Sequence, residues 1–141
     1  MKRKTTKRLM TVILFSALMV GGCSGAGNGG DAKSYKMISQ DEAMRIMSED
    51  GDYILLDVRT LEEFDEGHIP GAVCIPNEMI GDKEIPELGD EKDRTILVYC
   101  RSGRRSKEAA EKLAALGYTD VREFGGIITW TGDIVTSYEE E

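Results

Sequence analysis

One cysteine of this chain lies where its sulfur could act as a nucleophile. An apolar run from Thr95 to Tyr99 ends at Cys100, and the next five residues contain Gly103 and three arginines. Backbone N–H groups in a glycine-containing loop can turn inward and surround a sulfur or an oxyanion. A cysteine reacts as its thiolate, which a following helix N-terminus and nearby cations stabilise. The stretch 95–117 therefore predicts an activated thiol.

The charges around this cysteine contrast with those of the rest of the chain. The chain has 141 residues and a net charge of −8, yet four cations fall within seven positions of the cysteine: Arg101, Arg104, Arg105 and Lys107. Cations at a helix N-terminus oppose the helix dipole, so local stability alone does not explain them. They favour an anionic substrate. The acidic balance elsewhere excludes nucleic acid as a partner.

Other catalytic chemistries lack the residues that they need. His68 is the only histidine and is followed by the turn sequence Ile69-Pro70-Gly71, so we expect it to stabilise that turn. A Ser-His-Asp arrangement is not predicted. The cysteines are too widely spaced for a metal site, and no nucleotide-binding glycine pattern appears. The sequence therefore predicts an enzyme without metal or cofactor.

Strand-like and helix-like segments alternate along the chain. Tyr53 to Leu56 is a continuous apolar run typical of a buried strand, and Thr60 with Glu63 forms a capping box that starts a short helix ending at Gly67. Further strands are expected at 35–38, 72–75, 95–99 and 121–124. Helices are expected at 40–49, where Ser39 and Glu42 form a second capping box, and at 106–116. One or two surface helices are expected within 76–93. This alternation predicts an α/β fold with a parallel sheet. Its ligand site would lie at the carboxyl ends of the strands, where Asp57 and Cys100 fall.

The N-terminal residues have the composition of an export signal. Basic residues are followed by twelve mostly apolar residues, Leu9 to Val20, which are too few to cross a bilayer comfortably. Val20-Gly21-Gly22-Cys23 resembles a bacterial lipobox, so we expect residues 1–22 to be removed as a lipoprotein signal peptide and Cys23 to be lipidated. This signal predicts an extracytoplasmic protein anchored to a bacterial membrane through lipid. Plain secretion and an uncleaved anchor are the alternatives.

The remaining chain divides into three parts. Residues 23–34 are rich in glycine and polar residues and form the predicted flexible tether. Residues 35–136 form the predicted domain, and 137–141 an acidic tail. Cys74 lies in a short apolar segment and is expected to be a small core residue, although a Cys74–Cys100 disulfide stays open in an exported protein.

Four motifs together resemble a single rhodanese-like domain. In chain order they are Leu56-Asp57-Val58-Arg59-Thr60-Leu61-Glu62-Glu63-Phe64, Gly67-His68-Ile69-Pro70-Gly71-Ala72, Cys100-Arg101-Ser102-Gly103-Arg104-Arg105-Ser106, and Gly125-Gly126 with Trp130. The resemblance covers about residues 35–130. It implies a rhodanese-like α/β fold with a five-stranded parallel sheet flanked by helices.

The same resemblance implies a thiosulfate sulfurtransferase. The Cys100 thiolate would take the outer sulfur of a small anionic donor such as thiosulfate, and the resulting persulfide would pass it to cyanide, a thiol or a protein acceptor. The implied substrate-binding residues are Arg101, Ser102, Gly103, Arg104 and Arg105. Asp57 and Arg59 match a motif with an expected supporting role, in which Arg59 holds the neighbouring loop in place.

Two alternatives remain beside sulfur transfer. Phosphatase and arsenate reductase relatives of this fold have five residues between cysteine and arginine, whereas here four residues separate Cys100 from Arg105. The shorter loop fits a sulfur atom better than a tetrahedral phosphate. The second alternative is a non-enzymatic persulfide or thiol carrier that docks a partner protein.

Overall fold

The computed structural model describes residues 34–49, 51–81 and 83–137, all within a compact unit that spans Asp31–Glu141. The predicted signal peptide, Cys23, the tether up to residue 33 and tail residues 138–141 lie outside these ranges. Within them, every helix is too short or too polar to cross a membrane.

Five parallel strands form one sheet in the order β1-β5-β4-β2-β3. The predicted fold class, a five-stranded parallel α/β sheet, is confirmed. The strands are β1 (Lys36–Met37), β2 (Tyr53–Asp57), β3 (Val73–Cys74), β4 (Thr95–Cys100) and β5 (Val121–Gly126). The inner strands β2 and β4 are buried along nearly their whole length, as expected for strands covered on both faces.

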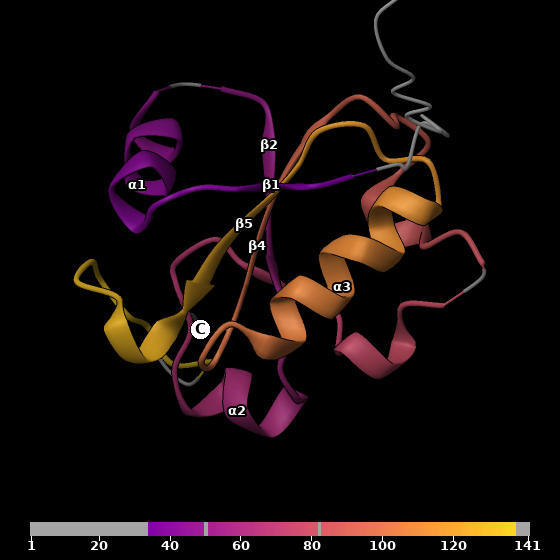
Figure 1. The fold of residues 1–141 in the computed structure, drawn as a ribbon. Coiled ribbons are helices and arrows are strands. Elements are labelled where there is room, and N and C mark those ends of the chain that lie inside the picture. The colour runs from indigo at the N-terminus through magenta and orange to yellow at the C-terminus, as the bar shows by residue number, and fades with distance from the viewer. Residues whose placement is uncertain (1–33, 50, 82, 138–141) are drawn as a thin grey trace, which may run out of the picture. The chain divides into compact units, whose positions relative to one another are not determined.

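Helices cover both faces of the sheet. They are α1 (Gln40–Ser48), α2 (Leu61–Glu66) and α3 (Arg104–Ala115), with 3-10 helices η1 (Asn77–Met79), η2 (Pro86–Leu88) and η3 (Ile127–Thr129). Figure 1 shows α1 and α3 on opposite sides of the strands and α2 beyond the end where the β5 arrow points. The core is accordingly in two parts. Leu113 packs with Ile96 and Val98 on the α3 face, whereas Ala43 packs with Leu97 and Phe124 on the α1 face.

The two predicted capping boxes differ in the structure. At α2 the box is complete, because Thr60 accepts from the Glu63 N–H and the Glu63 carboxylate accepts from the Thr60 N–H. At α1 only half forms. Ser39 caps the Glu42 N–H at 3.1 Å, but the Glu42 carboxylate turns outward to Arg45 at 2.7 Å. An arginine one turn away thus competes for the glutamate that the motif would use.

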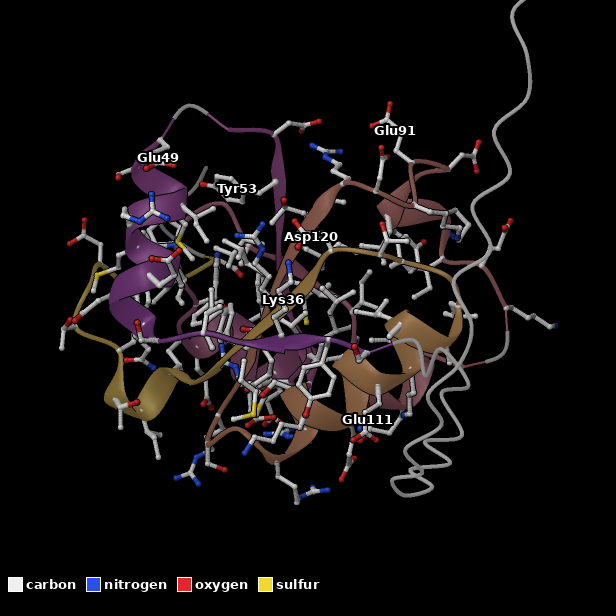
Figure 2. All side chains as sticks on the ribbon, turned by 45° about the horizontal axis from the view of Figure 1, so that its top comes forward. Lys36, Glu49, Tyr53, Glu91, Glu111 and Asp120 are labelled. Carbon is white, nitrogen blue, oxygen red and sulfur yellow. The ribbon has the colours of Figure 1, made fainter. Side chains whose placement is uncertain are left out.

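Charged side chains cover the outside of the domain. Figure 2 shows three exposed glutamates projecting outward: Glu49 just after α1, Glu91 in the loop before β4, and Glu111 on α3. Lys36 on β1 pairs with Asp120 at 3.6 Å, just before β5 begins.

Two boundaries differ by two residues from the sequence predictions, and the other helix and strand boundaries agree to within one residue. Strand β5 continues two residues beyond Phe124, through Gly125 and Gly126. Helix α3 begins at Arg104 and not at Ser106, because Gly103 adopts a left-handed conformation (φ 103°) and turns the chain directly into the helix. The expected surface helices within 76–93 are the short 3-10 helices η1 and η2.

Candidate active site

Cys100 ends β4 and lies directly before the N-terminus of α3. The residue is 1% exposed. Its Sγ accepts a hydrogen bond from the Gly103 N–H at 3.0 Å, and the Ser106 hydroxyl lies 3.4 Å away. This N–H donor and the N-terminal end of a twelve-residue helix both favour a sulfur that carries negative charge. The structure therefore places the predicted nucleophile in an environment suited to a thiolate.

The backbone of the cysteine loop lies in close contact with the end of strand β5. A register shift between β4 and β5 pairs Cys100 with Gly126. A Cβ on Gly126 would lie 2.1 Å from the carbonyl oxygen of Arg101 and 2.6 Å from the Cα of Ser102. Only glycine fits there. The Gly-Gly pair thus ends the last strand and lets the loop lie directly on it. The Ile128 N–H also donates to the Arg101 carbonyl at 3.2 Å.

The three loop arginines have different surroundings. Arg104 is exposed and pairs with Glu108 one turn along α3 at 2.6 Å. Arg105 makes two hydrogen bonds to the Glu63 carboxylate, at 2.7 and 2.8 Å. The side chain of Arg101 is exposed and lacks an ion pair within the described ranges. Of the predicted anion-binding side chains, Arg101 is therefore the one whose charge is not already balanced by a carboxylate.

The Glu63–Arg105 ion pair joins α2 to the cysteine loop. Hydrogen bonds from Arg105 lower the pKa of Glu63 to about 2, with a further contribution from the Thr60 backbone. The pKa of Arg105 is raised, mainly by the same hydrogen bonds and also by the charge of Glu63. The two cations at the start of α3 are thus each compensated by a carboxylate, which offsets their conflict with the helix dipole.

Asp57 and Arg59 form a buried ion pair at the end of β2. Their closest oxygen and nitrogen lie 2.6 Å apart, and the Asp57 carboxylate also accepts from the Arg59 N–H. Burial alone disfavours the charged guanidinium, but the hydrogen bonds and charge of Asp57 raise the pKa of Arg59. The Arg59 guanidinium also donates to the Gly67 carbonyl at 2.7 Å. Arg59 therefore ties the turn after α2 to the end of β2.

His68 holds the same turn from the other side. The residue is buried, its ring stacks on Phe64 with centroids 3.7 Å apart, and its Nδ1 lies 2.8 Å from the Phe64 carbonyl. Its backbone pairs with Val135 in both directions. These contacts agree with the predicted turn-stabilising position.

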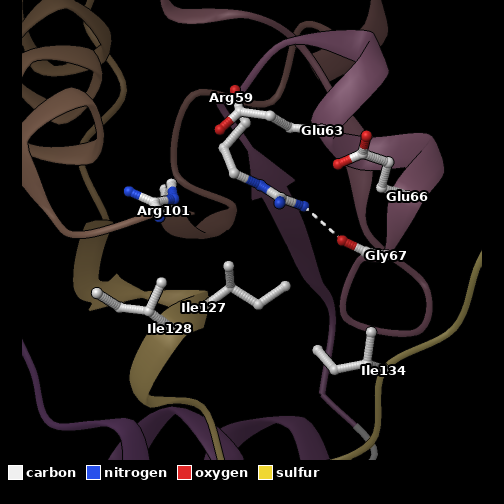
Figure 3. A pocket seen from close by; sticks show the side chains of 8 residues that line it. All are labelled: Arg59, Glu63, Glu66, Gly67, Arg101, Ile127, Ile128 and Ile134. Carbon is white, nitrogen blue, oxygen red and sulfur yellow. Dashed lines mark hydrogen bonds between the residues drawn. The ribbon is translucent and has the colours of Figure 1, made fainter.

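An open pocket of about 290 Å³ adjoins the cysteine loop. Figure 3 shows Arg101 on one side and Glu66 on the other, with Ile127, Ile128 and Ile134 opposite Arg59. Arg59 and Glu63 already have charged partners. The pocket thus combines an aliphatic wall with one uncompensated cation beside the nucleophile.

Cys74 and Cys100 are both free thiols, so the disulfide that the sequence left open is absent from the structure. Cys74 is half-buried rather than fully enclosed in the core, and its Sγ lies 3.7 Å from the Arg59 carbonyl. Burial and the charge of Asp57 raise the pKa of the Cys74 thiol to about 11. This thiol is therefore a poor nucleophile at neutral pH. The described residues also contain no cluster of three or more metal-binding side chains.

Sequence reasoning missed two polar residues beneath Cys100. Ser106 was taken as a helix start and Glu123 as an ordinary strand residue, but both are buried and hydrogen-bonded to each other at 2.6 Å. The available signal was the alternation of strand residues, which places Glu123 on the same face as the apolar Val121. Its partner lies 17 positions away, which spacing alone does not reveal.

Known proteins with similar sequences and structures agree with this geometry. A family model described as the rhodanese-like domain matches residues 39–133. The thiosulfate sulfurtransferase PspE of Escherichia coli is 38% identical over 72 residues, which cover 51% of this chain and 68% of that protein. A sulfurtransferase of Allochromatium vinosum is 38% identical over 96 residues, covering 66% and 85% of the two chains.

A solved structure described as rhodanese with anions from E. coli has a TM-score of 0.54 and 33% identity, and the match covers 60% of this chain and 98% of that one. The family model covers more than half of the chain and includes Asp57, Cys100 and Gly126. The chain therefore belongs to the rhodanese-like domain family.

Proposed function

We propose that this chain is a sulfurtransferase that carries sulfane sulfur on Cys100 as a persulfide. The observation that carries the proposal is the position of Cys100 Sγ, 3.0 Å from the Gly103 N–H at the start of α3. Relatives named sulfurtransferases at 38% identity support sulfur transfer in general. The donor, the acceptor and the role of each arginine are the parts that we propose here.

In the first half-reaction, the Cys100 thiolate attacks the outer sulfur of thiosulfate. A new S–S bond forms, the bond between the two thiosulfate sulfurs breaks, and sulfite leaves with the electron pair. The exposed guanidinium of Arg101 is positioned to bind the anionic donor and the departing sulfite. The loop N–H groups would stabilise the charge on the outer persulfide sulfur.

In the second half-reaction, an acceptor takes that outer sulfur. Cyanide or a thiolate attacks it, the Cys100–sulfur bond breaks, and the Cys100 thiolate is restored. The aliphatic wall formed by Ile127, Ile128 and Ile134 offers apolar contact to the carbon chain of a thiol, which cyanide lacks. We therefore propose a thiol, either small or carried by a protein, as the acceptor that this pocket favours.

Intact-mass measurement after incubation with thiosulfate tests the mechanism. We expect an adduct of one sulfur atom that disappears with a thiol and is absent in Cys100→Ser. An adduct that survives this substitution, or no adduct at all, would refute the persulfide mechanism. Hydrolysis of a phosphate ester by the same preparation would instead favour the phosphatase alternative.

We also propose that the chain acts outside the cytoplasm, anchored to a bacterial membrane through lipid on Cys23. Support comes from the lipobox-like sequence Val20-Gly21-Gly22-Cys23 and the basic and apolar residues before it. Fractionation of cells after labelling with a fatty acid tests this proposal. Label should enter the wild-type chain and be lost in Cys23→Ser, and equal labelling of the two would refute it.

A further inference from the structure

A buried carboxylate lies behind the nucleophile. Glu123 on β5 is 2% exposed, Ser106 on α3 is fully buried, and Cys100 is 1% exposed. The Ser106 hydroxyl lies 2.6 Å from Glu123 Oε1 and 3.4 Å from Cys100 Sγ. The Gly125 N–H donates to the same Glu123 oxygen at 2.8 Å. The three side chains form a continuous line from the sulfur to the carboxylate.

If Ser106 is hydrogen-bonded both to Cys100 and to Glu123, the line needs a second proton. Besides Cys100 and Glu123, the Ser106 oxygen faces the carbonyls of Gly103 at 3.1 Å and Gly125 at 3.4 Å, both of which only accept. A serine hydroxyl supplies one proton. If it donates to Glu123, the bond toward Cys100 needs the thiol proton. If it donates to Cys100, the bond toward Glu123 needs a carboxyl proton.

Both arrangements satisfy the line, and they differ only in where the second proton resides. In one, Cys100 is a thiol and Glu123 a carboxylate. In the other, Cys100 is a thiolate and Glu123 a carboxylic acid. We propose that Glu123 is the internal proton acceptor for Cys100, reached through the hydroxyl of Ser106. Ser106 touches the reacting sulfur, and Glu123 acts through Ser106.

This relay rests on the proposed sulfur transfer and completes its proton balance. The Cys100 S–H bond breaks, its proton moves to the Ser106 oxygen, and the Ser106 proton moves to Glu123. The thiolate then takes sulfur from the donor while Glu123 keeps the proton. When the acceptor removes that sulfur, the same steps in reverse return the proton to Cys100. No proton has to cross to solvent, which matters because the sulfur is buried.

Two other charged or titratable groups face the line. The Arg105 guanidinium on α3 interacts electrostatically with Cys100. The Tyr35 phenol, at the N-terminal end of the described chain, interacts with the charge of Glu123. Arg105 is held by Glu63, so its charge is constant over the range in which the relay is tested.

Glu123→Gln in the full chain tests the relay. Glutamine can still accept from Ser106 and Gly125 but cannot take up the proton. The readout is the rate at which iodoacetamide alkylates Cys100, followed by peptide mass spectrometry between pH 5 and 8. Glu111→Gln is the matched control, since it removes one negative charge from the exposed surface of α3. The rate of persulfide formation from thiosulfate is measured in parallel.

A proton relay and a fixed buried charge predict opposite changes in the alkylation rate of Cys100 when Glu123 is replaced. If Glu123 accepts the proton, Glu123→Gln slows alkylation at pH 6 by about tenfold or more, and Glu111→Gln leaves it unchanged. If Glu123 is only a buried negative charge, removing it favours the thiolate, and equal or faster alkylation would overturn the proposal. Ser106→Ala interrupts the line independently and should slow alkylation to the same extent, and an unchanged rate there would also overturn it.

The double variant gives a stricter test, because substitutions of two residues in one relay should not have additive effects on the alkylation rate. Glu123→Gln with Ser106→Ala should be no slower than either single variant, and a multiplied loss would contradict a shared path. The experiment also distinguishes failure of the proposed sulfur transfer from failure of the relay. A wild-type chain whose Cys100 is alkylated rapidly but takes no sulfur from thiosulfate would refute sulfur transfer from that donor and leave the relay supported.

Discussion

Replacement of Gly126 by alanine tests how the cysteine loop is supported. The backbone of Gly126 has φ −133°, which any residue can adopt, so the substitution introduces a clash without backbone strain. The new Cβ would lie 2.1 Å from the Arg101 carbonyl oxygen, whereas ordinary contact begins at 3.4 Å. The three nearest atoms belong to the loop backbone and cannot rotate away. The loop must therefore retreat by about 1.3 Å.

The cost follows from that displacement. Overpacking a tight contact costs about 1–3 kcal/mol, and a backbone clash of this depth belongs at about 3 kcal/mol or above. For a domain of this size each kcal/mol lowers Tm by about 4 °C or more, which gives a loss of about 12 °C. A displacement of about 1 Å at a reacting group can also cost about 100-fold in rate. We expect both losses in Gly126→Ala.

Two other glycines provide matched controls. A Cβ on Gly81 or on Gly71 meets nothing within 4 Å. Gly81 has no positive φ, so Gly81→Ala should leave Tm unchanged, whereas Gly71 has φ 79° and Gly71→Ala should cost about 1 kcal/mol in strain. Neither should slow sulfur uptake by Cys100. Thermal unfolding and intact-mass kinetics measure these effects, and a Gly126→Ala chain with wild-type Tm and rate would refute the reasoning.

Three further predictions concern the groups around the loop. Arg59→Met leaves the buried Asp57 carboxylate without its partner and should cost about 3–5 kcal/mol in urea unfolding; a cost below that of Arg104→Met would contradict it. Glu63 has a folded pKa of about 2, below its ordinary 4.5, so the stability it adds is full above pH 4.5 and lost as the pH falls towards 2. Because the ion pair is partly exposed, we expect it to add about 1 kcal/mol to the free energy of unfolding at pH 7. The measurement is the difference in that free energy between wild type and Glu63→Gln, which should vanish near pH 2. For Cys74, whose thiol pKa is about 11, thiol counting without reductant on Cys23→Ser should find two thiols, and iodoacetamide at pH 8 should modify Cys100 first. Prior loss of Cys74 would be inconsistent with the raised pKa of its thiol.

The arrangement of elements could be predicted from local patterns. The runs at 53–56 and 96–99 are apolar, which parallel strands covered on both faces require. Thr60 with Glu63 marked the start of α2. Gly103 and the position of Cys100 at a strand end indicated a tight loop that leads from β4 into α3. These features depend on residues close together in sequence, and the structure reproduces them.

The contacts that complete the site join residues far apart in the chain. The Glu63–Arg105 pair spans 42 positions, and a sequence pattern assigned Glu63 only to a cap and Arg105 only to substrate. Ser106 and Glu123 meet because β5 packs beside α3 and β4. A polar residue facing inward cannot be assigned a partner until the sheet order is known. The predicted start of α3 was also two residues late. Two arginines are unfavourable at a helix start unless carboxylates compensate their charges, and those ion pairs were not evident from the sequence.

The support of the cysteine loop by Gly126 has a consequence for folding. Gln40, the first residue of α1, donates to the Gly126 carbonyl at 2.9 Å across 86 positions, and β1 pairs with β5. Contacts of such separation form late, because the loop between them must close first. During synthesis, the chain up to Cys100 can be complete while the surface beneath its loop does not yet exist. The thiol would gain its activated environment only as the last strand joins the sheet, which protects an unfolded chain from premature oxidation or alkylation at Cys100.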